Sequence, residues 1–192
     1  MKFFSQYAII NMLLYKNALA ERGKQMYKIG DHVVYGIHGV CRVLDQEERT
    51  VDRKKVLYYV LEPLEQTGAR YYIPAHNQAA LAKLRPVMSR QELDALLASD
   101  AVRKDSWVPD ENQRKQVYRE LINSGDRAAL ICMVGSLHRH KEAQAAAGRK
   151  FHLCDENFLR DAEKLLSSEF SLILGVAPNQ VQDYIVSALK IE

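Results

Sequence analysis

The sequence lacks the usual signatures of catalysis and of metal binding. Its 192 residues contain no GxSxG, P-loop, GxGxxG or HExxH motif and no CxxC pair. The three cysteines, Cys41, Cys132 and Cys154, are far apart and odd in number, so we expect free buried thiols in a reducing cytoplasm. We therefore interpret the chain as a cytoplasmic protein that is not an enzyme and needs no cofactor.

Long apolar runs are also missing. The longest candidate, Phe3–Tyr15, is 13 residues and is broken by polar residues such as Ser5, whereas a membrane-spanning helix needs about 20 apolar residues. Followed by Ala18–Ala20, it superficially resembles a signal peptide. We interpret residues 1–25 as an N-terminal extension. It is either a non-native segment before an alternative start at Met26, or a short amphipathic helix, or a signal peptide. No membrane partner is expected.

Neither sign of charge dominates the chain. The net charge is +3, but in residues 88–192 the Asp and Glu residues outnumber Lys and Arg by 16 to 14. A slightly acidic half cannot bind polyanions over its whole surface, so any contact with nucleic acid must use a local basic patch.

Residues 26–86 carry dense strand and turn signals, beginning with Met26–Val43. Short β-prone runs alternate with turn residues, and a polar connection over Arg49–Lys55 holds a turn at Asp52. The expected strands are Val33–Tyr35, Val40–Val43, Val56–Leu61 and Ala69–Ile73, the last stopped by Pro74. This spacing is typical of a five-stranded antiparallel barrel of the SH3 or Tudor kind, whose function usually lies on an exposed edge strand.

Residues 88–192 show helical periodicity instead. A capping box at Ser89–Glu92 predicts a first helix that ends near Ser99. Four further helices are expected, from Asp110 to about Asn123, from Asp126 to Gly148, from Asp155 to Gly175, and from Pro178 onward. The predicted fold class is thus α+β, with an N-terminal SH3- or Tudor-like barrel followed by an all-α bundle.

These residues resemble the CarD/CdnL family of bacterial transcription regulators, whose first domain also occurs in the transcription-repair coupling factor. The resemblance begins at Met26 and covers nearly all of residues 26–192. It rests in the first part on Gly30-Asp31, Val33-Val34-Tyr35, His38-Gly39, Tyr58–Leu61 and Ile73-Pro74 near Asn77. In the second part it rests on Trp107, Arg114-Lys115, Ser124-Gly125-Asp126, Asp155, Ala162-Glu163 and Glu169.

The resemblance implies two binding activities. Residues 26–86 would be an RNA-polymerase-interacting domain that pairs its edge strand with the polymerase β subunit, and residues 88–192 would be a helical DNA-binding domain. The polymerase contacts would fall on Arg49 and on Arg70, Tyr71, Tyr72 and Ile73. Some relatives have arginine where this chain has Tyr72. Trp107 would act as a wedge in the minor groove of promoter DNA and stabilise the open complex without reading sequence.

Basic residues near Trp107 support a DNA contact. Arg114, Lys115 and Arg119 follow it closely, and residues 107–150 hold eight Lys or Arg against five acidic residues. So few phosphate contacts predict weak, salt-dependent binding that polymerase recruitment would assist. A different interpretation makes Trp107 a hydrophobic plug between the two domains. His138 and His140 point about 200° apart on a helix and cannot share a metal ion.

The sequence therefore predicts a transcription regulator, monomeric when free, that binds the RNA polymerase β subunit and promoter DNA. The alternative is a protein–protein adaptor, with a Tudor-like barrel and a purely structural helical bundle.

Overall fold

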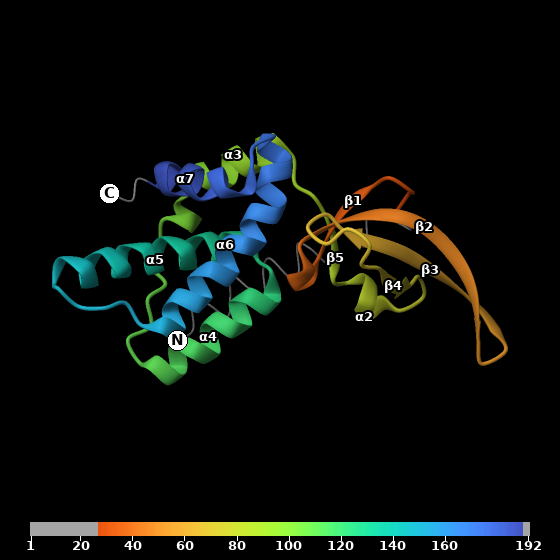
Figure 1. Cartoon of the computed structure of the whole chain (residues 1–192), viewed down its shortest axis with the longest axis horizontal. Coiled ribbons are helices and arrows are strands. Elements are labelled where there is room, and N and C mark those ends of the chain that lie inside the picture. Colours follow the sequence, from red (N-terminus) through yellow and green to blue (C-terminus); the bar gives the residue numbers. More distant parts are fainter. Residues whose placement is uncertain (1–26, 190–192) are drawn as a thin grey trace.

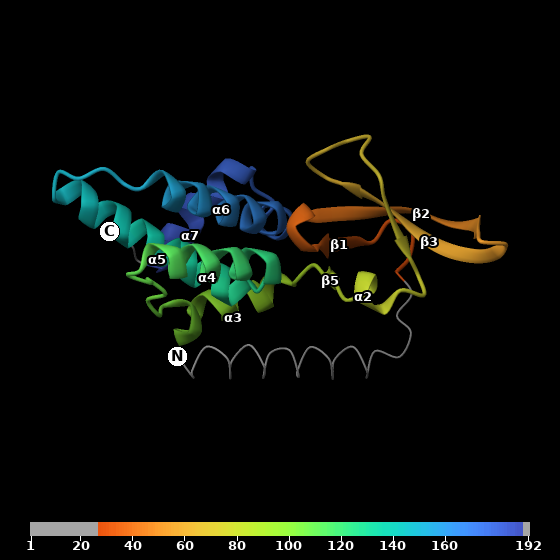
Figure 2. The same cartoon turned by 90° about the horizontal axis from the view of Figure 1, so that it is seen from below.

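The computed structural model describes residues 27–189; the predicted extension over residues 1–25 lies outside this range. Two parts lie side by side (Figures 1 and 2). We call residues 32–86 the sheet part and residues 90–189 the helical part. The predicted α+β class is confirmed, because five antiparallel strands precede most of the helices.

The sheet part holds a single five-stranded sheet in the order β4-β3-β2-β1-β5, with antiparallel neighbours throughout. Its strands are β1 (His32–Tyr35), β2 (Val40–Val51), β3 (Lys54–Pro63), β4 (Tyr71–Pro74) and β5 (Leu84–Pro86). A 3-10 turn, η1 (Gly36–His38), joins β1 to β2. The predicted closure into a barrel is not seen, since β4 and β5 form the two ends of an open sheet.

The long β2–β3 hairpin corrects one sequence prediction. Arg49–Lys55 was expected to be a polar connection, but both strands run through most of it, and the turn is only Asp52-Arg53. Both turn residues have positive φ, 51° and 62°, as a type I′ turn requires. The hairpin therefore extends well beyond the other strands and points away from the helices (Figures 1 and 2).

The sheet core follows from strand register. Val33 pairs with Cys41, Val43 with Leu61, and Tyr59 with Ile73, and side chains at paired positions share one face of a sheet. All these residues are buried in one cluster together with Leu84 of β5. This cluster contains no charged residue among its buried members.

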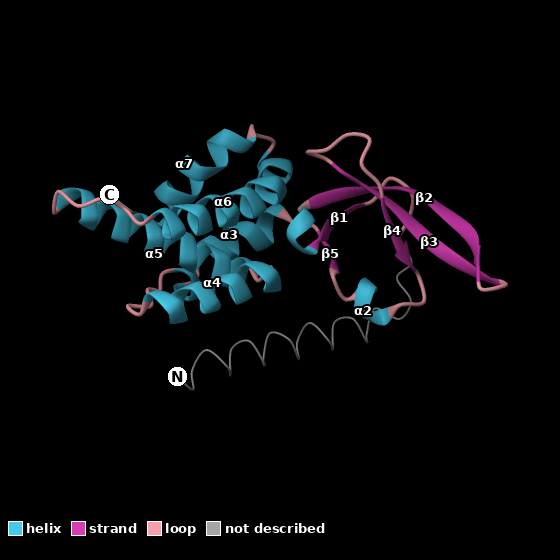
Figure 3. Ribbon diagram, turned by 60° about the horizontal axis from the view of Figure 1, so that its bottom comes forward, coloured by secondary structure: helices cyan, strands magenta, loops and turns pink. Residues whose placement is uncertain are grey.

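The helical part confirms the five predicted helices, because their caps are local signals. They are α3 (Arg90–Ala98), α4 (Glu111–Ser124), α5 (Arg127–Ala146), α6 (Leu153–Leu174) and α7 (Pro178–Leu189). Ser89 forms the capping box with Glu92, and Asp110 and Asp126 cap α4 and α5. Sequence reasoning missed the short η2 (Asp100–Val102) and α2 (Gln78–Leu81), the latter beside the sheet (Figure 3).

The predicted start of one helix was wrong. Asp155 was expected to cap the fourth helix, but α6 begins at Leu153 with His152 at the N-cap. Asp155 lies in the first turn, 2% exposed, where Arg114 of α4 holds its carboxylate. Helix α6 packs against α4, α5 and α7, and α5 and α6 together contribute most of the buried core residues of the helical part.

Candidate functional site

The outer edge of β4 is the first candidate interface. β4 pairs with β3 from Tyr58↔Pro74 to Leu61↔Tyr71, and no strand of the described chain pairs with its other side. Such an edge presents unpaired backbone N–H and C=O groups, which another chain can extend by strand addition.

An exposed arginine–tyrosine pair lies next to this edge. The guanidinium carbon of Arg49 lies 3.8 Å from the ring centroid of Tyr72. Glu47 holds the same guanidinium, with Nε and Nη2 at 3.0 and 2.8 Å from one carboxylate oxygen. Tyr72 remains 36% exposed. The fold thus brings together two residues predicted to bind polymerase that are 23 positions apart in the sequence.

The other three predicted polymerase contacts occupy different environments. Arg70 is exposed directly before β4, where its charge helps to lower the pKa of Glu62 after the larger effects of the Gly68 N–H and Arg42. Tyr71 is half-buried, and its ring contacts the rings of Tyr35 and His38. Ile73 is 3% exposed in the sheet core, so it can contribute to an edge contact only through its backbone.

The surroundings of Trp107 form the second candidate interface. Its indole, half-buried before α4, stacks on the imidazole of His140 with ring centroids 3.5 Å apart and planes 19° apart. The guanidinium carbon of Arg114 lies 4.2 Å from the indole centroid. Both partners belong to the helical part. Trp107 is therefore packed against α4 and α5 and does not plug a gap between the two parts.

Arg114 does not fit its predicted role as a phosphate contact. Its side chain is buried, and its Nε and Nη2 donate to the two Asp155 carboxylate oxygens at 2.9 and 3.0 Å. Nη1 donates to the carbonyls of Val108 and Pro109. A guanidinium held in this way orients the chain around Trp107 and is not offered to solvent.

Lys115 and Arg119 lie closer to the surface of α4. The Lys115 ammonium pairs with Glu111 one turn earlier, but its side chain remains partly exposed and can still reach a phosphate. Arg119 is exposed.

A hollow of about 400 Å³ opens beside the indole and carries basic residues that sequence reasoning did not single out. Its aromatic and basic lining residues include Trp107, Arg114, His140, Arg149, Lys150 and His152, and the carboxylates of Glu111 and Asp155 line it as well. Arg149 and Lys150 come from the connection between α5 and α6, just after Gly148. In the sequence, the available signal was a basic pair after a glycine that ends a helix. The pair lies beside Trp107 only because the chain turns back between α5 and α6.

Two neighbouring residues of α6 make hydrogen bonds in the contact between the two parts, where α4 also meets η1. Ser168 Oγ accepts the Val40 backbone N–H at 2.9 Å. The Glu169 carboxylate accepts the Met88 N–H and two N–H groups of Arg127, and Arg127 also donates to the Pro86 carbonyl. These bonds tie the end of the sheet part to the middle of the helical part.

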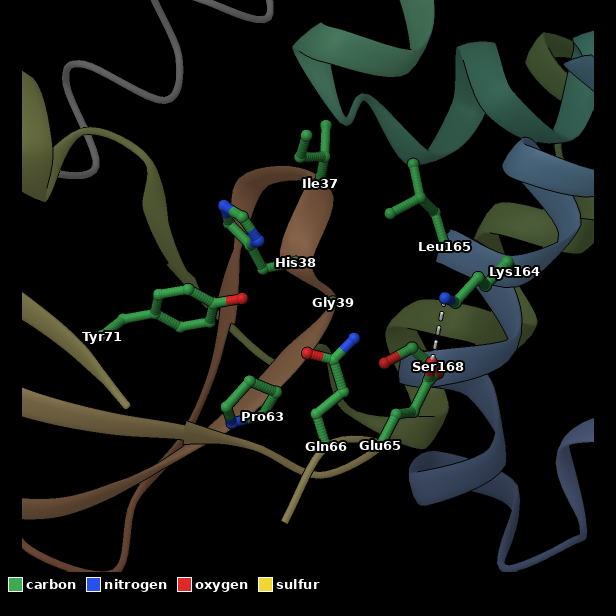
Figure 4. A pocket seen from close by; sticks show the side chains of 10 residues that line it. All are labelled: Ile37, His38, Gly39, Pro63, Glu65, Gln66, Tyr71, Lys164, Leu165 and Ser168. Atoms are coloured by element: carbon green, nitrogen blue, oxygen red, sulfur yellow. Dashed lines mark ion pairs between the residues drawn. The ribbon is translucent and has the colours of Figure 1, made fainter. Parts of the chain in front are cut away.

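Figure 4 shows a small hollow of about 80 Å³ in this contact, between η1 and α6. His38 and Tyr71 line it from the sheet part, and Lys164 and Ser168 line it from α6. The ion pair between Lys164 and Glu65 crosses its mouth at 3.7 Å. Tyr71 thus turns toward the helical part, unlike its neighbour Tyr72.

Within residues 27–189, no group of three or more His, Cys, Asp and Glu side chains is arranged to hold a metal ion. No helix in the same range has the length and apolarity that crossing a membrane requires.

Comparison with known proteins finds a family match over the segment that contains the first candidate interface. Residues 27–88, the sheet part with its short flanks, match the family described as the CarD-like/TRCF RID domain. Over 169 residues the chain is 24% identical to the "Putative transcription factor YdeB" of Bacillus subtilis (strain 168), covering 83% of this chain and 99% of that relative. Together, the two findings support a CarD-like transcription regulator.

Proposed function

We propose that the protein binds the RNA polymerase β subunit through the outer edge of β4 and contacts promoter DNA through the Trp107 region. The observation that carries the first half is the unpaired β4 edge, located inside the segment that matches the CarD-like/TRCF RID domain. The exposed Arg49–Tyr72 pair beside it supplies side-chain specificity, because arginine and tyrosine are enriched among the residues that dominate interfaces.

The DNA half of the proposal rests on the hollow beside Trp107. Arg149 and Lys150 line this hollow together with the indole, and Lys115, paired with Glu111, adds a cation on α4. Phosphate contacts of this kind position DNA without reading its sequence, and an apolar ring that enters a base step stabilises unstacked DNA. Binding melted DNA better than paired DNA shifts the promoter equilibrium toward the open complex, by that difference in affinity alone.

The proposal is tested by capturing the isolated polymerase β subunit on the immobilised protein. The double variant Arg49→Ala/Tyr72→Ala should bind roughly tenfold more weakly or worse, because both side chains flank the edge. The control is Arg90→Ala/Tyr184→Ala, an arginine–tyrosine pair on the helical part with 5.9 Å between guanidinium carbon and ring centroid, in which Arg90 is exposed and Tyr184 is half-buried. Equal loss in both variants, or none in either, contradicts the assignment to β4.

One observation favours the second candidate, a protein–protein adaptor whose helical part is structural. Both Trp107 and Arg114 are engaged in contacts within the helical part. If the unmodified protein failed to capture the β subunit at all, the adaptor with another partner would be the better interpretation.

A further inference from the structure

The indole of Trp107 has two faces, and both are covered. The imidazole of His140 lies parallel to it at a centroid distance of 3.5 Å, which fills one face. A guanidinium whose carbon lies 4.2 Å from the same ring has no room on that face beside the imidazole. Arg114 and His140 therefore enclose the indole from opposite sides, and only the ring edge is open.

The two covers differ in how firmly they are held. Arg114 is 4% exposed and donates to both oxygens of Asp155 and to two backbone carbonyls. His140 is half-buried, and its described polar contact is with Gln144 on its own helix, 3.2 Å away. Moving Arg114 would break a buried ion pair, whereas His140 can turn about its side-chain torsions toward the open hollow.

The cover is a neutral aromatic ring near neutral pH. Burial lowers the pKa of His140, and the nearby positive charges of Arg114 and Arg149 lower it further. The carboxylates of Asp155 and Asp105 act in the opposite direction. A flat neutral heterocycle stacked on an indole occupies the same space that a stacked nucleobase would occupy.

We propose that His140 is a removable cover on Trp107, and that an unpaired nucleobase replaces the imidazole when the protein engages melted DNA. This inference rests on the proposed function and deepens it, because it names the group that the Trp107 site binds and the residue that competes with it. The hollow next to the stack, with Arg149 and Lys150 in its wall, has room for the displaced imidazole and for the backbone of the flipped nucleotide.

The stack itself can be measured without DNA. Trp107 is the only tryptophan, so the emission excited at wavelengths that tyrosine does not absorb reports this ring alone. His140→Ala should change the emission intensity and shift the maximum to longer wavelength, because one face becomes open to water. The matched control is His138→Ala, two positions earlier on α5, whose imidazole contacts Glu163 and whose loss should leave the emission unchanged.

The competition is measured at low salt by fluorescence anisotropy of two labelled duplexes, one fully paired and one with a three-base unpaired bubble. Removing a contact of the free state should make His140→Ala bind the bubble roughly 2- to 10-fold more tightly than wild type, the range that aromatic pairs are worth. Binding to the paired duplex should not change. His140→Phe, which keeps a stacked ring, should bind the bubble no more tightly than wild type.

Equal bubble binding by His140→Ala and wild type overturns the proposal. Tighter binding by His140→Ala also overturns it if the paired duplex shows the same increase, or if His140→Phe shows it too. The same holds if the tighter binding survives in a His140→Ala/Trp107→Ala double variant. An absence of bubble binding by either protein also overturns it. An absence of bubble binding also contradicts the DNA half of the proposed function. The other results leave wild-type bubble binding and capture of the polymerase β subunit intact, so failure of the cover alone is distinguishable from failure of the proposed function.

Discussion

The two parts of the molecule differ in what they bury. The buried residues of the sheet part are apolar, apart from the Cys41 thiol and the Tyr59 hydroxyl, whereas the helical part buries Arg114, Asp155 and Glu169 together with three serines. Both parts nevertheless carry an arginine over an aromatic ring beside a carboxylate. In the sheet part this group is exposed, as Arg49, Tyr72 and Glu47. In the helical part it is enclosed around Trp107.

The two groups are suited to different kinds of binding. An exposed pair next to an unpaired strand edge is ready for a partner and contributes little to the fold. An enclosed pair anchored by a buried carboxylate orients the aromatic ring before any ligand arrives. The sheet part should therefore tolerate changes at its candidate interface, whereas the helical part should not tolerate loss of the buried Arg114–Asp155 pair.

The largest effect is expected at Asp155. Asp155→Ala leaves the Arg114 guanidinium buried without its partner, which should lower the free energy of unfolding by about 3–5 kcal/mol in urea denaturation. The control is Glu111→Ala, which breaks the surface pair with Lys115 and should leave the unfolding midpoint nearly unchanged. Similar midpoints for the two variants would mean that the buried pair does not organise the helical part.

A smaller effect is expected where the parts touch. A Cβ at Gly39 would lie 2.5 Å from Ser168 Oγ, and its φ of +71° disfavours other residues. Gly39→Ala should cost on the order of 2–3 kcal/mol. Adding Ser168→Ala should recover part of this loss, although it removes the bond to Val40. A double-mutant cycle measures the coupling, and strictly additive losses would contradict the close contact.

The sheet core makes a prediction about alkaline pH. Burial raises the pKa of the Cys41 thiol from 9.0 to about 11. Between these values the unfolded chain releases a proton that the folded chain keeps, so raising the pH favours unfolding. This contribution is intact below about pH 9 and is lost on approach to pH 11, with a size on the order of 2 kcal/mol.

The check is the pH dependence of urea denaturation for wild type and Cys41→Val. The variant should lose less stability over this interval. Parallel curves for wild type and Cys41→Val would show that the Cys41 thiol does not carry the effect.

The smallest effect on stability is expected at the exposed pair. Arg49→Ala should leave the urea midpoint unchanged within error, because an exposed ion pair contributes little, while it weakens capture of the polymerase β subunit. A large fall in the urea midpoint would contradict the proposal that the exposed pair of the sheet part, unlike the enclosed pair of the helical part, contributes little to stability.

Much of the fold was predictable because its signals are local. Ser89 with Glu92, Asp110, Gly125 and Pro178 mark helix ends through neighbours in sequence, and the structure confirms each of them. The strands were recognised by composition, although their lengths and the open sheet were not.

The environment of the candidate site was not predictable, because it depends on distant partners. Arg114 looks like a surface cation until Asp155, 41 residues later, is placed beside it. Likewise, the pairing of Arg49 with Tyr72 and the stacking of His140 on Trp107 follow from tertiary packing. Sequence periodicity shows which residues share a helix face, but not which groups from other elements cover them.

The central claim is that the protein holds polymerase through β4 and favours melted DNA through Trp107. The most direct measurement is the lifetime of the open promoter complex with wild type and with Trp107→Ala at saturating protein. The lifetime should be about tenfold shorter with Trp107→Ala, since unstacking a base step costs a few kcal/mol, with capture of the β subunit unchanged. An unchanged lifetime with intact capture would contradict the central claim.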